Sequence, residues 1–282
     1  MGETSKIQWT DSTANPWRGC TKVSEGCQFC YAERLASRNP AVLGEWGPQG
    51  TRVLAAESTW RQFERWNRDT PEGSRNLVFC ASLADVFEDW PGQMTDCLGA
   101  QLVQEDGSPY LLASARVRLW QVIRRTPRLI WQVLTKRPQN IARMMPHGPW
   151  ENVWLGTSIE SQEWSDRCGE LVDAGTAIMG PVRFLSAEPL LGPLDVRRWL
   201  HPNGINWVII GGESGGRSRP MQIDWARDLI AQCKEAHIPC FVKQMGRMAL
   251  DGKVRLPLVH DSSHGGDPED WPEDLNVREI PD

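Results

Sequence analysis

The stretch from Trp207 to Lys243 carries the pattern that decides the fold. It opens with Trp207-Val208-Ile209-Ile210-Gly211 and closes with Pro239-Cys240-Phe241-Val242-Lys243. Both runs are almost unbroken in apolarity, which is typical of strands that are buried on both faces and lie in a parallel sheet. Between them, Asp224 is suited to cap a helix whose apolar residues recur at helical spacing. Those residues are Ala226, Leu229, Ile230, Cys233 and Ala236. The stretch therefore predicts one strand–helix–strand unit.

The same alternation covers most of the chain. Four more runs have the character of buried strands, at residues 76–81, 129–134, 153–157 and 182–186, and a weaker one lies near 16–19. Helix-like segments separate them. Six strands and a weaker seventh over about 230 residues fit either a partial (β/α) barrel or an open doubly wound sheet, because a full eight-unit barrel takes about 250 residues. Periodicity does not separate these two architectures.

Length and charge bound the class of protein. The chain has 282 residues, enough for one large domain or two small ones. Its 31 basic and 36 acidic residues give a net charge of −5. This balance argues against non-specific coating of nucleic acid but leaves room for a local basic patch. No run of about eighteen apolar residues occurs, and the start lacks the apolar stretch of a signal peptide. We therefore expect a cytoplasmic protein with no membrane partner.

Polar residues follow every predicted strand. Parallel α/β folds place their chemistry at the carboxyl ends of the strands, so these residues are the first candidates for a site. They include Ser82, Asp85, Lys136, Arg137, Ser158, Glu160, Ser186, Glu188, Glu213, Ser214 and Lys243. The run Gly211–Gly216 lets the backbone approach a ligand closely, although a plain structural turn is the alternative. Lys243 ends an apolar strand and needs a partner, for which Glu188 and Glu213 are the candidates.

Three of the eight cysteines lie within eleven residues. The segment Gly19-Cys20-Thr21-Lys22-Val23-Ser24-Glu25-Gly26-Cys27-Gln28-Phe29-Cys30-Tyr31 has the spacing C-x6-C-x2-C. Clustered thiolates select zinc or an iron–sulfur cluster. Structural zinc takes four ligands, whereas the next cysteine is Cys80 and the first histidine is His147. Three thiolates on a four-iron cluster leave one iron open to a small molecule. Cys80, Cys168, Cys233 and Cys240 are expected in the core.

Several motifs carry a resemblance that spans residues 6 to 281. Clustered cysteines with an aromatic residue just before the last one resemble the radical S-adenosylmethionine (radical SAM) enzymes, whose usual spacing is C-x3-C-x-aromatic-C. Six residues stand here in place of the three in the first gap. Further motifs are similar to the phage-associated three-Cys-motif family. They are residues 7–11, 15–16, 19–24, 26–27, 30–33, 132–138, 152–156, 188–193, 211–215 and 243–244.

The resemblance implies a fold, two cofactors and a reaction. The fold is a partial (β/α) TIM-like barrel of about six to seven parallel strands, over residues 1–248, with an acidic C-terminal extension over 249–282 packed on it. The cofactors are a [4Fe-4S] cluster held by Cys20, Cys27 and Cys30, and S-adenosylmethionine, with Phe29 touching the adenine. The cofactor-binding candidates are Phe29, Ser82, Ser158, Glu188, Gly211, Gly212, Glu213 and Ser214. The implied reaction is reductive cleavage of S-adenosylmethionine to a 5′-deoxyadenosyl radical, with an electron donor of the flavodoxin or ferredoxin kind and a family partner protein.

A basic strip runs from Ser114 to Arg143, with eight Lys or Arg, no acid, and the interleaved Trp120 and Trp131. Such a strip suits phosphate contact and base stacking, and a solvated helix face is the alternative. A nucleic-acid base or nucleotide is therefore the first substrate class expected, with contacts from Arg116, Arg124, Arg125, Lys136 and Arg137. Two other functions stay open: a zinc-stabilised nucleic-acid-binding or interaction protein, and a cluster-bearing structural or electron-transfer protein.

Overall fold

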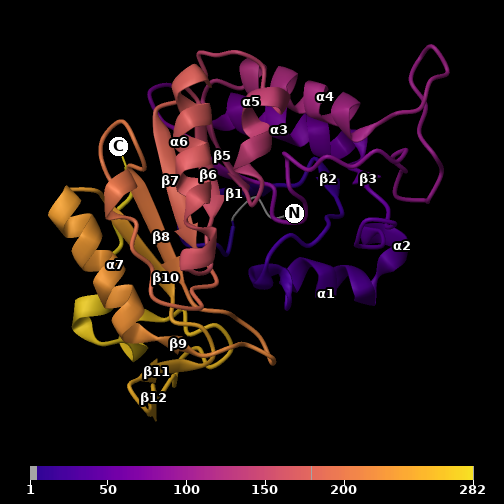
Figure 1. The fold of residues 1–282 in the computed structure, drawn as a ribbon. Coiled ribbons are helices and arrows are strands. Elements are labelled where there is room, and N and C mark those ends of the chain that lie inside the picture. The colour runs from indigo at the N-terminus through magenta and orange to yellow at the C-terminus, as the bar shows by residue number, and fades with distance from the viewer. Residues whose placement is uncertain (1–4, 179, 282) are drawn as a thin grey trace. The chain divides into compact units, whose positions relative to one another are not determined.

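A seven-stranded sheet is the central element of the computed structural model, which describes residues 5–178 and 180–281 (Figure 1). In spatial order its strands are β1 (Ser12–Ala14), β4 (Asn76–Cys80), β5 (Leu129–Thr135), β6 (Val153–Ser158), β7 (Val182–Ala187), β8 (Trp207–Gly211) and β10 (Cys240–Gln244). The pairs β1–β4, β4–β5, β7–β8 and β8–β10 are each parallel. The six strongly predicted strands thus end within two residues of their expected bounds.

The strand order decides between the two architectures that periodicity left open. A doubly wound sheet reverses its order at a switch point, whereas here each strand is followed in the sheet by the next one along the chain. That order is the one of a (β/α) barrel, and the predicted partial barrel is confirmed. The helices are α1 (Tyr31–Arg38), α2 (Pro40–Leu43), α3 (Glu57–Asp69), α4 (Leu112–Arg125), α5 (Ile141–Met144), α6 (Asp166–Ile178) and α7 (Ile223–Ala236).

Two local expectations were wrong. The weaker strand near 16–19 is not part of the large sheet; its place is taken by β1, while β2 (Trp17–Arg18) pairs antiparallel with β3 (Val53–Leu54). Helix α7 begins one residue before its expected cap, so Asp224 lies in the first turn, where its negative charge interacts favourably with the helix dipole.

A small separate sheet joins β12 (Val254–Arg255), β11 (Ala249–Asp251) and β9 (Met221–Gln222).

The chain forms two compact units. The first comprises residues up to Val23, Cys30–Trp154 and Ile178–Pro181; the second comprises Ser24–Phe29, Leu155–Ala177 and Val182 onward. The loop that carries the three cysteines therefore contributes to both. Cys20 and Cys30 belong to the first unit, and Cys27 belongs to the second. The boundary expected at residue 248 stays a prediction.

Tryptophans build much of the core of the first unit. Trp131 on β5 meets the edge of Phe63 on α3, with ring centroids 5.5 Å apart. Trp120 on α4 packs on Trp150 at 5.3 Å. Contacts of this kind add about 0.5–1.5 kcal/mol each beyond their buried area. The first contact packs α3 against β5, and the second packs α4 against Trp150, which precedes β6.

The C-terminal residues cover the exposed edge of the sheet in the second unit. Arg278 lies opposite Phe241 of β10 in an antiparallel bridge. The amide of Val242 donates to the carbonyl of Val277 at 2.8 Å, and the amide of Glu279 donates to Cys240 at 2.9 Å. The unpaired backbone groups of an uncovered edge strand can pair with another chain. These bonds instead pair the backbone groups of β10 within the same chain. Among the described residues, no helix is long and apolar enough to cross a membrane.

Candidate functional site

The eight cysteines fall into three groups by exposure. Cys80, Cys168, Cys233 and Cys240 are buried, as expected for core residues, and Cys97 is exposed. Cys20, Cys27 and Cys30 are half-buried, and all eight thiols are unbridged. Within residues 5–178 and 180–281, no three His, Cys, Asp or Glu side chains are gathered into a preformed metal-binding group.

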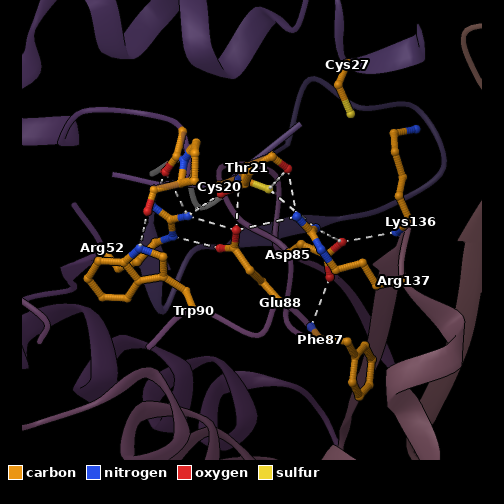
Figure 2. A network of polar contacts seen from close by, with 12 residues as sticks. Cys20, Thr21, Cys27, Arg52, Asp85, Phe87, Glu88, Trp90, Lys136 and Arg137 are labelled. Atoms are coloured by element: carbon orange, nitrogen blue, oxygen red, sulfur yellow. Dashed lines mark hydrogen bonds and ion pairs between the residues drawn. The ribbon is translucent and has the colours of Figure 1, made fainter. Parts of the chain in front are cut away.

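The position of Cys20 depends on the fit of the preceding Gly19 and on the guanidinium of Arg137, which lies beside the Cys20 sulfur (Figure 2). Gly19 has a φ of +107°, and an added Cβ would lie 2.3 Å from the carbonyl oxygen of Thr51, so only glycine fits there. Nη1 of Arg137 donates to the Cys20 Sγ at 3.7 Å. Burial, reinforced by the charges of Asp85 and Glu88, raises the pKa of the Cys20 thiol to about 12, and Arg137 opposes this rise.

Arg137 connects the Cys20 segment to the end of β4. Its Nη1 also contacts Asp85 Oδ2 at 2.8 Å, and its Nη2 donates to the Thr21 carbonyl at 2.7 Å. Asp85 in turn accepts from the Thr135 hydroxyl at 2.7 Å and from the Lys136 amide at 3.1 Å. Burial opposes the charge of Arg137, but Asp85, Cys20 and Glu88 outweigh it, and the pKa of Arg137 is raised.

A second buried ion pair completes this arrangement. Arg52 and Glu88 form two parallel bonds, Nε to Oε2 at 2.7 Å and Nη2 to Oε1 at 2.8 Å. The same Oε1 accepts the Thr21 amide at 2.9 Å, and Nη2 of Arg52 also donates to the Thr21 hydroxyl at 2.9 Å. We call these residues, Thr21, Arg52, Asp85, Glu88 and Arg137, the Cys20 network. Two cations and two anions balance within it, which is the condition under which buried charges are tolerated.

Cys27 lies in the segment Ser24–Phe29, which is held by residues of the second unit that are not part of the Cys20 network. Glu160, fully buried after β6, accepts from the Ser24 hydroxyl at 2.9 Å and pairs with Arg167 at 3.1 Å. The Ser24 hydroxyl lies 3.9 Å from the Cys27 Sγ. A Cβ on Gly26 would come within 2.3–2.6 Å of the Glu160 side chain. The close fit of Gly26 over Glu160 thus sets the path of the chain just before Cys27.

Arg219 fastens the same segment from the end of β8. It makes a two-pronged ion pair with the buried Glu213, with Nη2 to Oε1 at 2.6 Å and Nε to Oε2 at 2.9 Å. It also donates to the Glu25 carbonyl at 3.0 Å, and its guanidinium lies 5.2 Å from the centre of the Phe29 ring. Arg217 lies 5.6 Å from the same ring. Phe29, expected to touch adenine, therefore has cations on its ring.

The glycines after β8 serve close packing of the chain. A Cβ on Gly212 would be 2.1 Å from the Met245 carbonyl oxygen, and one on Gly211 would be 3.2 Å from the Glu188 carboxyl carbon. Glu188 forms the expected ion pair with Lys243, while Glu213 is bound to Arg219. Ser214 follows as a half-buried residue. A role of these residues in binding a cofactor stays a prediction.

The remaining candidates lie at other strand ends. The Ser82 hydroxyl, after β4, accepts from Asn15 at 3.0 Å, and its carbonyl accepts from the Tyr31 hydroxyl at 2.8 Å. This bond holds the start of α1, directly after Cys30, against the end of β4. Ser158 is buried at the end of β6, and its carbonyl accepts from Arg167 at 2.9 Å.

Most arginines of the basic strip are paired with acids or buried. Acidic residues from other parts of the first unit pair with it, as Arg118–Glu57 (2.6 Å), Arg125–Glu64 (3.2 Å) and Arg143–Asp89 (2.8 Å). Arg116 is buried and donates to the carbonyls of Val86 and Glu88, and Arg137 belongs to the Cys20 network. Lys136 is half-buried. Arg124 is exposed and lies over the ring of Trp150 at 4.3 Å.

Several residues that hold the cysteine loop were not predicted from the sequence. Arg52, Glu88, Arg167 and Arg219 stand in no motif with the cysteines, and each is separated in sequence from the loop contact that it supports. Glu88 carried the best signal, because it follows a predicted strand within the polar segment that includes Asp85. The sequence shows neither that Asp85 and Glu88 are buried nor that Arg52 and Arg137 are their partners.

Comparison with known proteins identifies a family. A family model described as "Protein of unknown function (DUF5131)" matches residues 4–265. No curated protein and no solved structure matches this chain.

Proposed function

We propose that this chain, which belongs to the DUF5131 family of proteins of unknown function, is an iron–sulfur enzyme of the radical SAM kind. Cys20, Cys27 and Cys30 are the proposed cluster ligands. The observation that carries the proposal is that three unbridged, half-buried thiols lie on one loop, while four other cysteines are buried in the core. The loop is tied at Cys20 to the ends of β4 and β5, and at Ser24–Phe29 to the ends of β6 and β8. In parallel α/β barrels that end of the strands carries the chemistry.

The donor set fits such a cluster. Three thiols without disulfide partners match the thiolate preference of iron–sulfur centres. Because thiols lose their protons on binding a metal, metal uptake should release protons and strengthen as pH rises. Arg137 is placed to offset the negative charge that then develops on the sulfur.

The cluster, when bound with S-adenosylmethionine, supplies one-electron chemistry that this chain lacks in its own side chains. The residues of the chain position the ligands. Glu160 and Arg219 hold Ser24–Phe29, and the Cys20 network holds Thr21. Phe29 with its two arginines offers an aromatic and cationic surface near Cys30 in sequence. Cofactor contacts from Ser82, Ser158, Glu188, Glu213 and Ser214 belong to this proposal.

The substrate class stays open within the proposal. A nucleic-acid base or nucleotide is favoured by the exposed guanidinium of Arg124, because an exposed arginine suits contact with phosphate. Pairing of Arg118, Arg125 and Arg143 with acids lowers the charge available for phosphate. An electron donor of the flavodoxin or ferredoxin kind would supply the reducing electron.

The test is a metal count on protein reconstituted without oxygen. Iron, sulfide and zinc are measured per chain for the wild type, Cys27→Ala and Cys168→Ala, the last being a buried cysteine on α6 that serves as a control. We expect close to four irons and four sulfides in the wild type and the control, and loss of the cluster in Cys27→Ala. One tightly bound zinc and no colour would instead establish the zinc-stabilised alternative. Full iron content in Cys27→Ala would overturn the ligand assignment.

A further inference from the structure

The geometry points to Arg137 as a positioning residue for the cluster. Its guanidinium fixes the Cys20 sulfur and, through one N–H···S bond and its positive charge, raises the reduction potential of the cluster. This inference rests on the proposed function. It concerns a residue that the sequence placed both among the polar groups at strand ends and among the candidate nucleic-acid contacts.

The contacts of Arg137 leave it little freedom. One nitrogen, Nη1, reaches both Asp85 Oδ2 at 2.8 Å and the Cys20 sulfur at 3.7 Å. The other, Nη2, donates to the Thr21 carbonyl at 2.7 Å and contacts Glu88 Oε1 at 3.4 Å. The guanidinium is thus clamped between two carboxylates and the backbone that follows Cys20. Because the fork is planar and its nitrogens are fixed relative to each other, fixing the carboxylates also fixes the donor to sulfur.

Burial strengthens the electrostatic effect of Arg137 on the Cys20 sulfur. Arg137 is 7% exposed, and Asp85 and Glu88 are 5% and 2% exposed. Water therefore screens these charges poorly. Hydrogen bonds to cluster sulfurs and net charge near the cluster are among the factors that set its potential. Reduction adds negative charge, which a donor aimed at a ligand sulfur stabilises, so removal of Arg137 makes the potential more negative.

The network allows the charge and the hydrogen bond to be separated. Arg52 and Arg137 balance Asp85 and Glu88. Arg137→Met removes the bond to sulfur and also leaves one uncompensated carboxylate. The double variant Arg137→Met/Asp85→Asn removes the bond but restores the balance. Arg137→Lys keeps the charge without the planar fork. The double variant also protects the fold, because Arg137→Met alone leaves a buried charge unpaired.

The control is Arg116→Met. Arg116 is buried to the same extent as Arg137, at 7%, and lies in the same unit. Its bonds go to the carbonyls of Val86 and Glu88, at 2.8 and 2.7 Å. It therefore tests the general cost of losing a buried guanidinium near these acids.

The experiment is an anaerobic redox titration of the reconstituted proteins, followed by electron paramagnetic resonance, with iron content and circular dichroism measured on the same samples. We expect Arg137→Met to lower the equilibrium constant for cluster reduction about tenfold, a shift of about 59 mV to more negative potential for one electron. The double variant and Arg137→Lys should shift less in the same direction, and Arg116→Met should match the wild type. A folded Arg137→Met protein that loses its iron, while Arg116→Met keeps it, also supports the positioning role.

Two results would count against distinct claims. Wild-type potential in both cluster-loaded Arg137→Met and the double variant would overturn the role of Arg137 while leaving the proposed function intact. A wild-type protein that takes up no iron would overturn the proposed function itself, before any variant is compared.

Discussion

Glu88 shows how much one buried side chain holds in place. Its carboxylate accepts two bonds from Arg52 and one from the Thr21 amide, and it contacts Arg137. Charges this deep persist only when every partner is present. The sequence offered no local sign of this, because Arg52 stands 36 positions before Glu88 and Thr21 stands 67 positions before it.

Glu88→Gln should therefore destabilise the protein strongly. The variant leaves Arg52 buried without its anion, which costs about 3–5 kcal/mol. The measurement is the free energy of unfolding from denaturant titration. Glu57→Gln is the matched control, since Glu57 pairs with Arg118 at the surface and its loss should cost less than about 1 kcal/mol. Equal losses in the two variants would contradict the buried network as drawn.

At the scale of elements, the strands were predictable and the cysteine loop was only partly so. Unbroken apolar runs marked β4 through β10 of the large sheet, because both faces of these strands are buried. β1 has only three residues, Ser12–Ala14, and too few apolar side chains to form such a run. The cysteine spacing was visible in sequence, whereas the groups that hold the loop come from the ends of separate strands.

Gly26→Ala should loosen the segment around Cys27. The new methyl group would displace the Glu160 side chain and break its bond to Ser24. We expect faster alkylation of Cys27 in metal-free protein, measured by peptide mass spectrometry. Gly169→Ala on α6 is the control, because its Cβ would meet only the Trp199 Nε1 at 3.4 Å. An unchanged rate in Gly26→Ala would show that Glu160 does not hold this segment.

The loop around Asp261 should respond to acid. Its carboxylate accepts bonds from the amides of Ser263, His264 and Gly266 and from the Ser263 hydroxyl. Burial opposes its charge, but these bonds prevail and hold the pKa of Asp261 at about 2. A lowered folded pKa contributes stability above the unfolded value of about 3.9, and this stability is lost as pH falls toward 2.

The stability difference between wild type and Asp261→Asn measures this contribution. It should be present at pH 6 and shrink between about pH 4 and pH 2 in urea titrations. A difference that stays constant over this range would mean that the ionised form of Asp261 is not the one the loop binds.

At the scale of the whole molecule, charges counted along the sequence predicted the surface poorly, whereas the apolar runs predicted the strands well. The strip from Ser114 to Arg143 has no acid of its own, yet the fold supplies Glu57, Glu64 and Asp89 from elsewhere in the first unit. The apolar runs, by contrast, marked the strands but not their order in the sheet, which only the structure shows.

Charge reversal tests what remains of the strip. Arg124→Glu/Arg125→Glu should weaken binding of a single-stranded oligonucleotide at least about tenfold at low salt, if the strip contacts phosphates. Fluorescence anisotropy measures the affinity. Arg197→Glu/Arg198→Glu changes the net charge equally and is the control, since both arginines are exposed and paired with acids in the second unit. Equal affinities of the two double variants would remove the nucleic-acid interpretation.

The central claim is an iron–sulfur cluster with one iron open to S-adenosylmethionine. The most direct measurement is the electron paramagnetic resonance spectrum of the anaerobically reconstituted, reduced protein, recorded with and without S-adenosylmethionine. We expect a four-iron spectrum that changes when S-adenosylmethionine is added. A four-iron spectrum that is identical in both samples, or a protein that holds zinc and shows no cluster signal, would contradict it.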